Sequence, residues 1–283
     1  MDSVDRLSSL MDRFRVRAHL FHAGPLCGLT QFDARPGRGF LHVLRHGELV
    51  VTHPPHSGAP PRVEVAEPAL LFYPRPLAHA FHNAPDEGSD FVCASLDFEG
   101  GLQHPLARAL PPLLVLPLRS VEGLEQTLAL LFAESARVRC GQRLLADRLF
   151  DVLLLQLLRW LLDHSAEASL PEGLLAGLAD PKLARALTAV HEKPGADWSL
   201  AAMAEAAGMS RSGFALAFKQ RVGSTPVEYL TQWRMAIAQS LLRSGVPVKA
   251  ASVQLGYRSA SSLSRAFTQT VGVSPRAWLH AQA

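Results

Sequence analysis

The residues able to bind a charged partner are distributed unevenly along this 283-residue chain. Residues 180–283 hold 12 lysines and arginines against 5 acidic residues, a net charge of +7, whereas residues 1–179 hold 16 basic and 20 acidic residues, a net charge of −4. Nine of the 12 histidines lie at or before His104. A basic segment joined to an acidic, histidine-rich one favours a polyanionic partner for the second part of the chain alone.

A sequence repeat lies within the basic part. Five landmarks of the first copy recur 49 residues later in the second copy: Phe214, Phe218, Gly223, Pro226 and Tyr229, then Leu263, Phe267, Gly272, Pro275 and Trp278. Each copy also has an Ala-rich helical stretch (200–207 and 248–255), followed by a glycine, Gly208 or Gly256, where a helix end needs a positive φ. This order predicts two helix-turn-helix units.

The second helix of each copy has a buried apolar stripe, so its opposite face is free to enter a major groove. In the first copy this face and its preceding turn comprise Ser210, Arg211, Ser212, Ala215, Leu216 and Lys219. In the second copy they comprise Arg258, Ser259, Ala260, Ser261, Ser264, Arg265 and Thr268. Two ordinary helical hairpins with solvated charges are the alternative, but they leave nine basic against two acidic residues from Trp198 onward unexplained.

The region from about Leu183 to Leu279 resembles the tandem helix-turn-helix domain of AraC/XylS-type transcriptional regulators. The most specific segment is GYRSASSLSRAFTQTVGVSPRAW, residues 256–278. The resemblance implies a double-stranded DNA operator, RNA polymerase as a partner if the protein is an activator, and no enzymatic activity or catalytic residues. It also implies a long helix between the two units, about Thr225 to Leu242, which includes Arg234.

The first unit departs from the family pattern at one position. Many members have an arginine where this chain has Leu216, whereas the corresponding residue of the second unit is Arg265. Neither Ala215 nor Leu216 can make bidentate hydrogen bonds to a base, so their contacts are limited to thymine methyl groups and sugars. We therefore expect the first unit to contribute mainly backbone affinity and shape readout.

The first part of the chain has the pattern of short strands. Apolar and polar residues alternate from Phe14 to Leu20, and further candidates follow at 29–34, 40–46, 48–53, 62–66, 69–73 and 90–98. The segments GPLCGL (24–29), LHVLRHGELVV (41–51) and LLFYPRPLAHAFHN (70–83) resemble the cupin-like effector domain of one branch of the same family. The fold class is thus α+β with two domains: an N-terminal cupin-like β-barrel with a helical dimerisation segment, and a C-terminal all-α tandem helix-turn-helix domain.

The cupin resemblance also implies where a metal would bind. The residues at the corresponding positions are His42, His46, Glu48, His79 and His82. The usual His-x-His spacing is absent, because Val43 and Leu44 follow His42. Ordinary barrel histidines are therefore favoured and no metal or other cofactor is predicted, with a metal-dependent cupin enzyme fused to the DNA-binding module as the alternative.

Three interpretations of the barrel remain open. Cupin-bearing relatives that respond to oxidants imply a redox role for Cys27 and Cys93, although free cysteines are commonly just buried apolar residues. A small-molecule effector is the other form of sensing, with His42 and His79 among its contacts, and with the aromatic residues Phe40, Phe72 and Tyr73. A constitutive DNA-binding protein without an effector is the remaining alternative.

Leucine-rich helical patterns follow the strands, from Val121 and again from about Arg143 to His164. They carry more apolar surface than one packed stripe needs, which indicates either core helices or a homodimer interface. We expect domains at 1–120 (sensor), 121–164 (helical segment), 165–180 (linker) and 181–283 (DNA-binding). The sequence has no run of about 20 uncharged apolar residues and an odd number of cysteines, which favours a cytoplasmic protein without a membrane partner.

Overall fold

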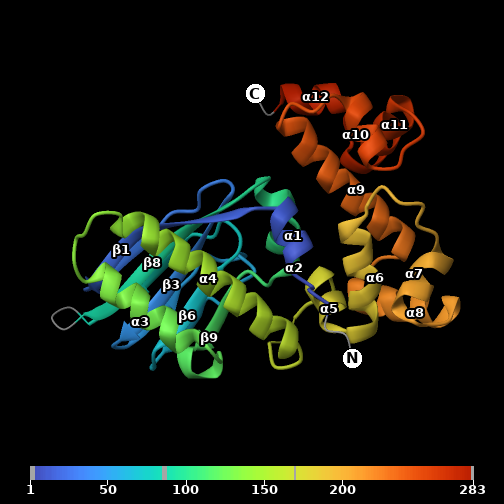
Figure 1. Ribbon diagram of the computed structural model, residues 1–283. Helices are drawn as coiled ribbons and strands as arrows, with labels where there is room; N and C mark the ends of the chain where they lie inside the picture. Colours follow the sequence, from blue (N-terminus) through green and yellow to red (C-terminus); the bar gives the residue numbers. More distant parts are fainter. Residues whose placement is uncertain (1–3, 85–87, 169, 282–283) are drawn as a thin grey trace. The chain divides into compact units, whose positions relative to one another are not determined.

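The computed structural model describes residues 4–84, 88–168 and 170–281, and the chain divides into two compact units (Figure 1). The segment Arg15–Leu170 forms one unit, which we call the barrel unit. The segment up to Phe14 joins the segment from Pro171 onward in the other, which we call the helical unit. This differs from the expected domains at both ends: the N-terminal segment groups with the C-terminal helices, and the expected linker 165–180 contains a helix.

The described part of the barrel unit has two antiparallel sheets. The five-stranded sheet has the order β1-β8-β3-β6-β9, with bounds Val16–Leu26, Ser89–Phe98, Arg38–His46, Ala69–Tyr73 and Leu114–Pro117. The four-stranded sheet has the order β2-β7-β4-β5, with bounds Leu29–Phe32, His79–His82, Leu49–Thr52 and Arg62–Val65. Their inner faces enclose an apolar core that includes Phe81, Phe91 and Cys93.

The strand candidates of the sequence are confirmed, with two additions. The alternation that predicted β1 is present, since Val16 and Ala18 are buried while Arg17 and His19 are exposed. Phe14 does not continue this strand but belongs to the helical unit. The sequence pattern missed β7 and β9, because each has only four residues and follows a proline-rich segment of the kind that indicates a loop.

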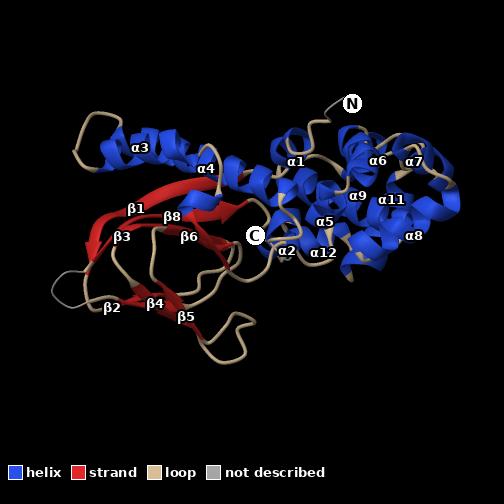
Figure 2. Cartoon of the chain, turned by 90° about the horizontal axis from the view of Figure 1, so that it is seen from below, coloured by secondary structure: helices blue, strands red, loops and turns tan. Residues whose placement is uncertain are grey.

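Two helices, α3 (Leu124–Ser135) and α4 (Gln142–Asp163), cover the five-stranded sheet on the side away from the four-stranded sheet (Figure 2). The shorter helix α2 (Pro105–Ala109) and the 3₁₀ turns Gly101–Gln103 and Leu118–Ser120 complete the connections. The sequence placed Cys140 in the helical region, and it lies in the turn between α3 and α4.

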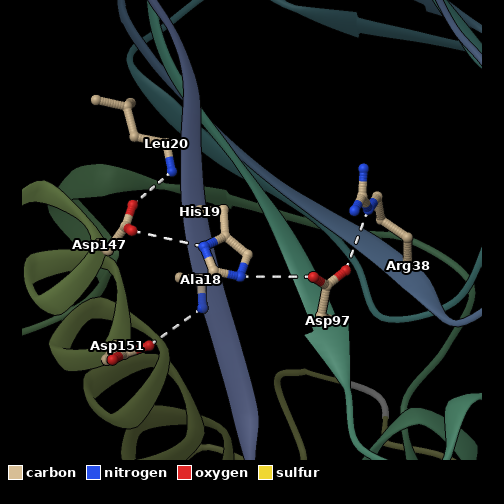
Figure 3. Close-up of polar contacts among 7 residues, drawn as sticks. All are labelled: Ala18, His19, Leu20, Arg38, Asp97, Asp147 and Asp151. Carbon is tan, nitrogen blue, oxygen red and sulfur yellow. Dashed lines mark hydrogen bonds and ion pairs between the residues drawn. The ribbon is translucent and has the colours of Figure 1, made fainter. Parts of the chain in front are cut away.

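Helix α4 is fixed to the edge strand β1 by two carboxylates (Figure 3). Asp147 Oδ1 accepts a hydrogen bond of 2.8 Å from the backbone N–H of Leu20, and Asp151 Oδ1 accepts one of 3.3 Å from that of Ala18. His19 lies 3.5 Å from both Asp147 and Asp97. These contacts satisfy N–H groups that an edge strand otherwise presents to solvent, and they prevent further strand pairing at this edge.

The helical unit consists of helices throughout its described elements. They are α1 (Ser8–Arg13), α5 (Leu174–Ala179), α6 (Pro181–Glu192), α7 (Leu200–Ala207), α8 (Arg211–Val222), α9 (Pro226–Arg243), α10 (Val248–Gln254), α11 (Ala260–Val271) and α12 (Pro275–His280). The predicted repeat is confirmed as the pairs α7–α8 and α10–α11, and the predicted connecting helix is α9.

The N-terminal helix α1 is an integral part of this unit. Leu10 is completely buried, and the ring of Phe14 meets Trp233 of α9 edge-on at 5.0 Å. Arg13 donates hydrogen bonds to the last carbonyls of α6, at 3.0 Å to His191 and 3.2 Å to Glu192. A basic side chain at a helix C-terminus satisfies carbonyls that the helix leaves unpaired and stabilises the helix dipole.

Within the described ranges, no helix has the length and apolar character that crossing a bilayer requires.

Candidate nucleic-acid interface and effector site

The first candidate recognition helix, α8, is positioned by its two ends and its buried stripe. Gly208, at φ 64°, ends α7, and Ser210 begins α8 by accepting a hydrogen bond of 3.3 Å from the backbone N–H of Gly213. Phe214 and Phe218 anchor the inner face in the core. The predicted outer residues are exposed, apart from the half-buried Ala215: Ser210, Arg211, Ser212, Leu216 and Lys219.

The second candidate recognition helix, α11, begins at a capping box. The Ser259 hydroxyl accepts from the backbone N–H of Ser262, and Ser262 Oγ accepts from the N–H of Ser259, each at 3.1 Å. Leu263 and Phe267 are completely buried. Of the predicted contacts, two are half-buried and five are exposed: Ala260 and Ser264, then Arg258, Ser259, Ser261, Arg265 and Thr268.

The sequence reasoning missed two exposed amides. Gln220 on α8 and Gln269 on α11 occupy equivalent positions of the repeat, and both are exposed. They lie one turn beyond Leu216 and Arg265, respectively, on the same face. A glutamine can donate to and accept from an adenine edge at the same time. The 49-residue offset that aligned the other positions also aligns these two.

Arg234 of α9 joins the two halves of the helical unit. Its guanidinium donates to the carbonyl oxygens of Pro194 at 2.7 Å and Ala196 at 2.9 Å, in the loop before α7. The same group lies 5.6 Å from the ring centroid of Tyr257, in the turn before α11. One side chain on the connecting helix therefore contacts both the loop that precedes the first helix-turn-helix unit and the turn between the two helices of the second.

A close approach of two glycines strengthens this connection. A Cβ placed on Gly256, whose φ is 71°, would lie 2.3 Å from the carbonyl oxygen of Gly195. A Cβ on Gly195 would in turn lie 2.3 Å from the carbonyl oxygen of Gln254. Only glycine fits at either position, so the backbone of the first half rests directly on that of the second. The arrangement fixes how far apart α8 and α11 lie.

A buried aromatic cluster forms the core of the first half. His191 Nε2 lies 2.6 Å from the hydroxyl oxygen of Tyr229, and the His191 ring stacks on Trp233 at 3.9 Å. Burial lowers the pKa of His191 from 6.5 to about 3, and the nearby Arg13 contributes to this decrease. The histidine is therefore neutral near pH 7, and it packs as an aromatic residue with one polar contact.

In the barrel unit, the structure brings together the predicted pair His42 and His79. Their Nε2 atoms lie 3.0 Å apart. His79 Nδ1 lies 2.9 Å from the carbonyl oxygen of Leu77, which can only accept, so this nitrogen carries the proton and His79 Nε2 accepts. His42 Nε2 is then the donor, which leaves His42 Nδ1 as a buried acceptor without a hydrogen-bond partner among the described residues.

Burial keeps this histidine pair uncharged. Desolvation lowers the pKa of His79 to about 4, and it lowers the pKa of His42 well below the usual 6.5, with His79 and His22 as smaller causes. The rings of Phe32, Phe40 and Tyr73 surround the pair. The centre of the barrel is thus a cluster of aromatic rings around two neutral imidazoles. None of these five side chains carries a charge that would balance a bound ion.

A cavity of about 330 Å³ lies at the edge of this cluster. His53 and His79 are both on its wall, and His53 is connected to the cluster because the Tyr73 hydroxyl donates to its Nε2 at 3.0 Å. The remaining lining residues are Gln31, Phe32, Asp33, Thr52, Pro54, Ala78 and Ala80. Of the residues expected to contact an effector, His79 lines this cavity, whereas Phe40, His42, Phe72 and Tyr73 do not.

The metal-ligand set implied by the cupin resemblance is not assembled. His46, Glu48 and His82 are exposed, and His82 Nε2 instead lies 3.0 Å from the Thr52 hydroxyl. Only His42 and His79 of the five candidates meet. No group of three or more histidine, cysteine or acidic side chains in the described ranges is placed to hold a metal ion.

The two candidate redox cysteines are far apart and differ in environment. Cys27 is exposed after the end of β1, whereas Cys93 is completely buried in β8, where burial raises the pKa of its thiol. Leu26, the residue before Cys27, pairs with Ser89 of β8. Ser89 is four residues from Cys93 along the strand, a distance of about 13 Å at the usual rise per residue, and Cys27 lies beyond it. A disulfide needs Cα atoms within about 7 Å, so this fold cannot form one between them without rearranging.

Comparison with known proteins matches residues 5–163 to the family described as Cupin and residues 203–281 to the family described as Helix-turn-helix domain. The chain is 36% identical over 194 residues to a Streptomyces antibioticus protein described as an AraC-like transcription regulator, covering 67% of this chain and 63% of that protein. It is 32% identical over 197 residues to the HTH-type transcriptional regulator AlkR of Acinetobacter baylyi, covering 68% and 63%. The match therefore spans less than two thirds of the length of these relatives.

Among solved structures, the chain matches the DNA-binding domain of AdpA in complex with a target DNA, at 30% identity and a TM-score of 0.34. This match covers 36% of the chain and 92% of that domain. The Cupin match precedes the Helix-turn-helix match, which is the order expected from the motifs. The resemblance to AraC-type regulators inferred from the repeat is therefore confirmed. The chain belongs to the AraC-type transcriptional regulators, in the branch that joins a cupin domain to a helix-turn-helix domain.

Proposed function

We propose that this protein regulates transcription by binding an operator in double-stranded DNA through α8 and α11, each in a major groove. The observation that carries the proposal is the pair of equivalent exposed faces in a region, residues 180–283, with 12 basic and 5 acidic residues. Arg265 supplies a bidentate contact to a guanine, and Lys219 contacts the phosphate backbone. RNA polymerase is a partner if the protein activates its target genes.

The barrel unit supplies the regulation by binding a small, uncharged effector at the cavity beside His53 and His79. The neutral imidazoles and aromatic rings disfavour a charged group beside them, because they would not offset the cost of burying an ion, and the carboxyl group of Asp33 on the same wall opposes an anion. This arrangement favours a small molecule over an oxidant acting through Cys27 and Cys93, since the distance between these cysteines opposes a direct disulfide. Effector binding alters how the helix-turn-helix units of a dimer are presented to paired half-sites.

Helices α3 and α4 offer a surface for a second copy of the chain. Exposed apolar side chains on α4 lie within one arc of the helix, which they share with the exposed Arg148 and Arg159. They are Leu144, Leu145, Val152 and Leu155, which are 66%, 49%, 42% and 36% exposed. Leu130 of α3 is 60% exposed. Water-exposed leucines in such a stripe favour association of two copies.

The test of this function is selection of duplexes from a random library of short DNA by the full chain, followed by titration of the enriched duplex at several salt concentrations. We expect one enriched sequence and an affinity that falls linearly with salt on logarithmic axes. The proposal would be refuted if the chain binds no DNA, or if it binds DNA without enriching any particular sequence. A screen of uncharged aromatic compounds against the same titration then tests whether an effector changes the affinity.

A further inference from the structure

Leu216 is the most unusual residue on the predicted DNA-contacting faces. It is 63% exposed on α8, with no charge or hydrogen-bonding group in its side chain, whereas the equivalent residue of α11 is the exposed Arg265. A single exposed leucine on a protein surface is ordinary. This one, however, occupies the central position of a helix face whose neighbours on both sides, Ser212 and Lys219, are polar or charged.

The chemistry of the major groove offers one group that suits such a side chain. A leucine side chain cannot form hydrogen bonds with the donors and acceptors on the bases. The 5-methyl group of a pyrimidine, however, is an apolar surface in the same groove. Contact between the two removes both from water. The polar residues Ser212 and Gln220 lie one turn to either side of Leu216, so hydrogen bonds to the flanking bases remain available.

We propose that Leu216 is a specificity-determining residue that packs against the 5-methyl group of a pyrimidine, while Arg265 contacts a guanine. This inference rests on the proposed DNA-binding function. The repeat is thus symmetric in fold and asymmetric in recognition: two equivalent helices select unlike bases. Arg234 and the contact of Gly195 with Gly256 hold the two helix-turn-helix units together. The methyl-bearing pyrimidine and the guanine therefore lie at one fixed separation in the operator.

The experiment uses the full chain and the duplex enriched by selection. A series of duplexes is made from it, and each of them replaces one thymine with uracil. This change removes one methyl group and leaves every hydrogen-bonding group in place. At one position we expect uracil to weaken binding about fourfold, the effect of one buried carbon group. A second duplex with 5-methylcytosine paired to guanine at that position distinguishes the methyl group from the thymine base, since cytosine and 5-methylcytosine differ only in the methyl.

The variant Leu216→Ala should bind the thymine and uracil duplexes equally at that position, because the contacting side chain is gone. Val253→Ala removes an exposed apolar side chain outside both recognition helices, and it should keep the fourfold difference. Leu216→Arg should change the preferred base at the same position to guanine. Leu216 is on the surface, so these variants keep the fold of the unit.

Two results would overturn the inference while leaving the proposed function intact. One is an enriched operator at which no uracil substitution changes the affinity of the wild-type chain. The other is a uracil effect that persists unchanged in Leu216→Ala. Failure to enrich any sequence would instead refute the proposed function, and this inference with it.

Discussion

The guanidinium of Arg234 lies 5.6 Å from the ring centroid of Tyr257 while it donates to two backbone carbonyls of the loop before α7. The side chain is partly buried, and burial, the largest of several causes, lowers its pKa. It thus links the loop that leads into the first helix-turn-helix unit to the turn inside the second. The distance between the recognition helices therefore depends on a residue that lies outside both of them.

Replacing Arg234 with alanine should loosen this connection. We expect a loss of about 1–3 kcal/mol in the free energy of unfolding, from two hydrogen bonds of a charged donor, measured by urea denaturation. The variant should also tolerate one or two inserted base pairs between the two halves of the operator better than the wild type does. Arg276→Ala, which removes an exposed arginine of the same unit, is the matched control, and an equal effect there would contradict the assignment.

The two basic residues of the recognition helices should differ in what they contribute. Arg265→Ala should cost about 1–3 kcal/mol in binding and relax specificity at one base pair. Lys219→Ala should weaken all sequences alike and reduce the slope of log affinity against log salt by about 0.9. Titration against a base-substituted operator series at several salt concentrations measures both effects. A uniform loss for Arg265→Ala would show that it contacts phosphate only.

The buried histidine pair should make the barrel unit sensitive to acid. The pKa of His79 falls from 6.5 to about 4 on folding, so between these values the unfolded chain binds a proton that the folded chain does not. The free energy of unfolding should fall as the pH decreases through this window, by up to about 1.4 kcal/mol per pH unit, and the contribution is fully present above about pH 6.5.

Urea denaturation at about pH 7.5, 6.0 and 5.0 measures this dependence. His79→Gln lowers stability overall but should show a shallower decline between about pH 6.5 and 5.0 than the wild type. His46→Gln removes an exposed histidine of the barrel unit and serves as the control. Identical slopes in the wild type and His79→Gln would mean that His79 is not held neutral by burial.

The exposed stripe of α4 should support self-association. Leu144→Glu places a charge where the side chain is 66% exposed, so it should shift the chain toward monomer in sedimentation equilibrium without unfolding it. Val138→Glu changes a 95% exposed residue in the turn before α4, and it should leave the oligomeric state unchanged. A dimer that withstands Leu144→Glu would place the interface elsewhere.

The cysteines should react according to their exposure. Iodoacetamide should label Cys27 and Cys140 in the folded chain, and Cys93 only after denaturation, because Cys93 is completely buried and its thiol pKa is raised. Mass spectrometry of the peptides measures the labelling. A Cys27–Cys93 disulfide after mild oxidation would reveal a rearranged state of the barrel and revive the redox interpretation.

The sequence by itself determined the local elements and their class. Period-two alternation predicted β1, short strand-like runs between turn residues predicted most of the other strands, and the repeat at an offset of 49 residues predicted α8 and α11 with their buried faces. The connecting helix α9 was implied by the family resemblance. These features depend on neighbouring residues and recur regularly, so a linear pattern records them. The difference between Leu216 and Arg265 at equivalent positions was also visible without a structure.

Only the tertiary structure decided which distant residues meet. It placed α1 beside α6 and α9, brought His42 to His79, and showed that Arg234 contacts both halves of the helical unit. It also separated Cys27 from Cys93 and left His46, Glu48 and His82 in solvent. Such contacts depend on strand register and on how helices pack across long loops, and a shift of one residue in register reverses which side chains face the core.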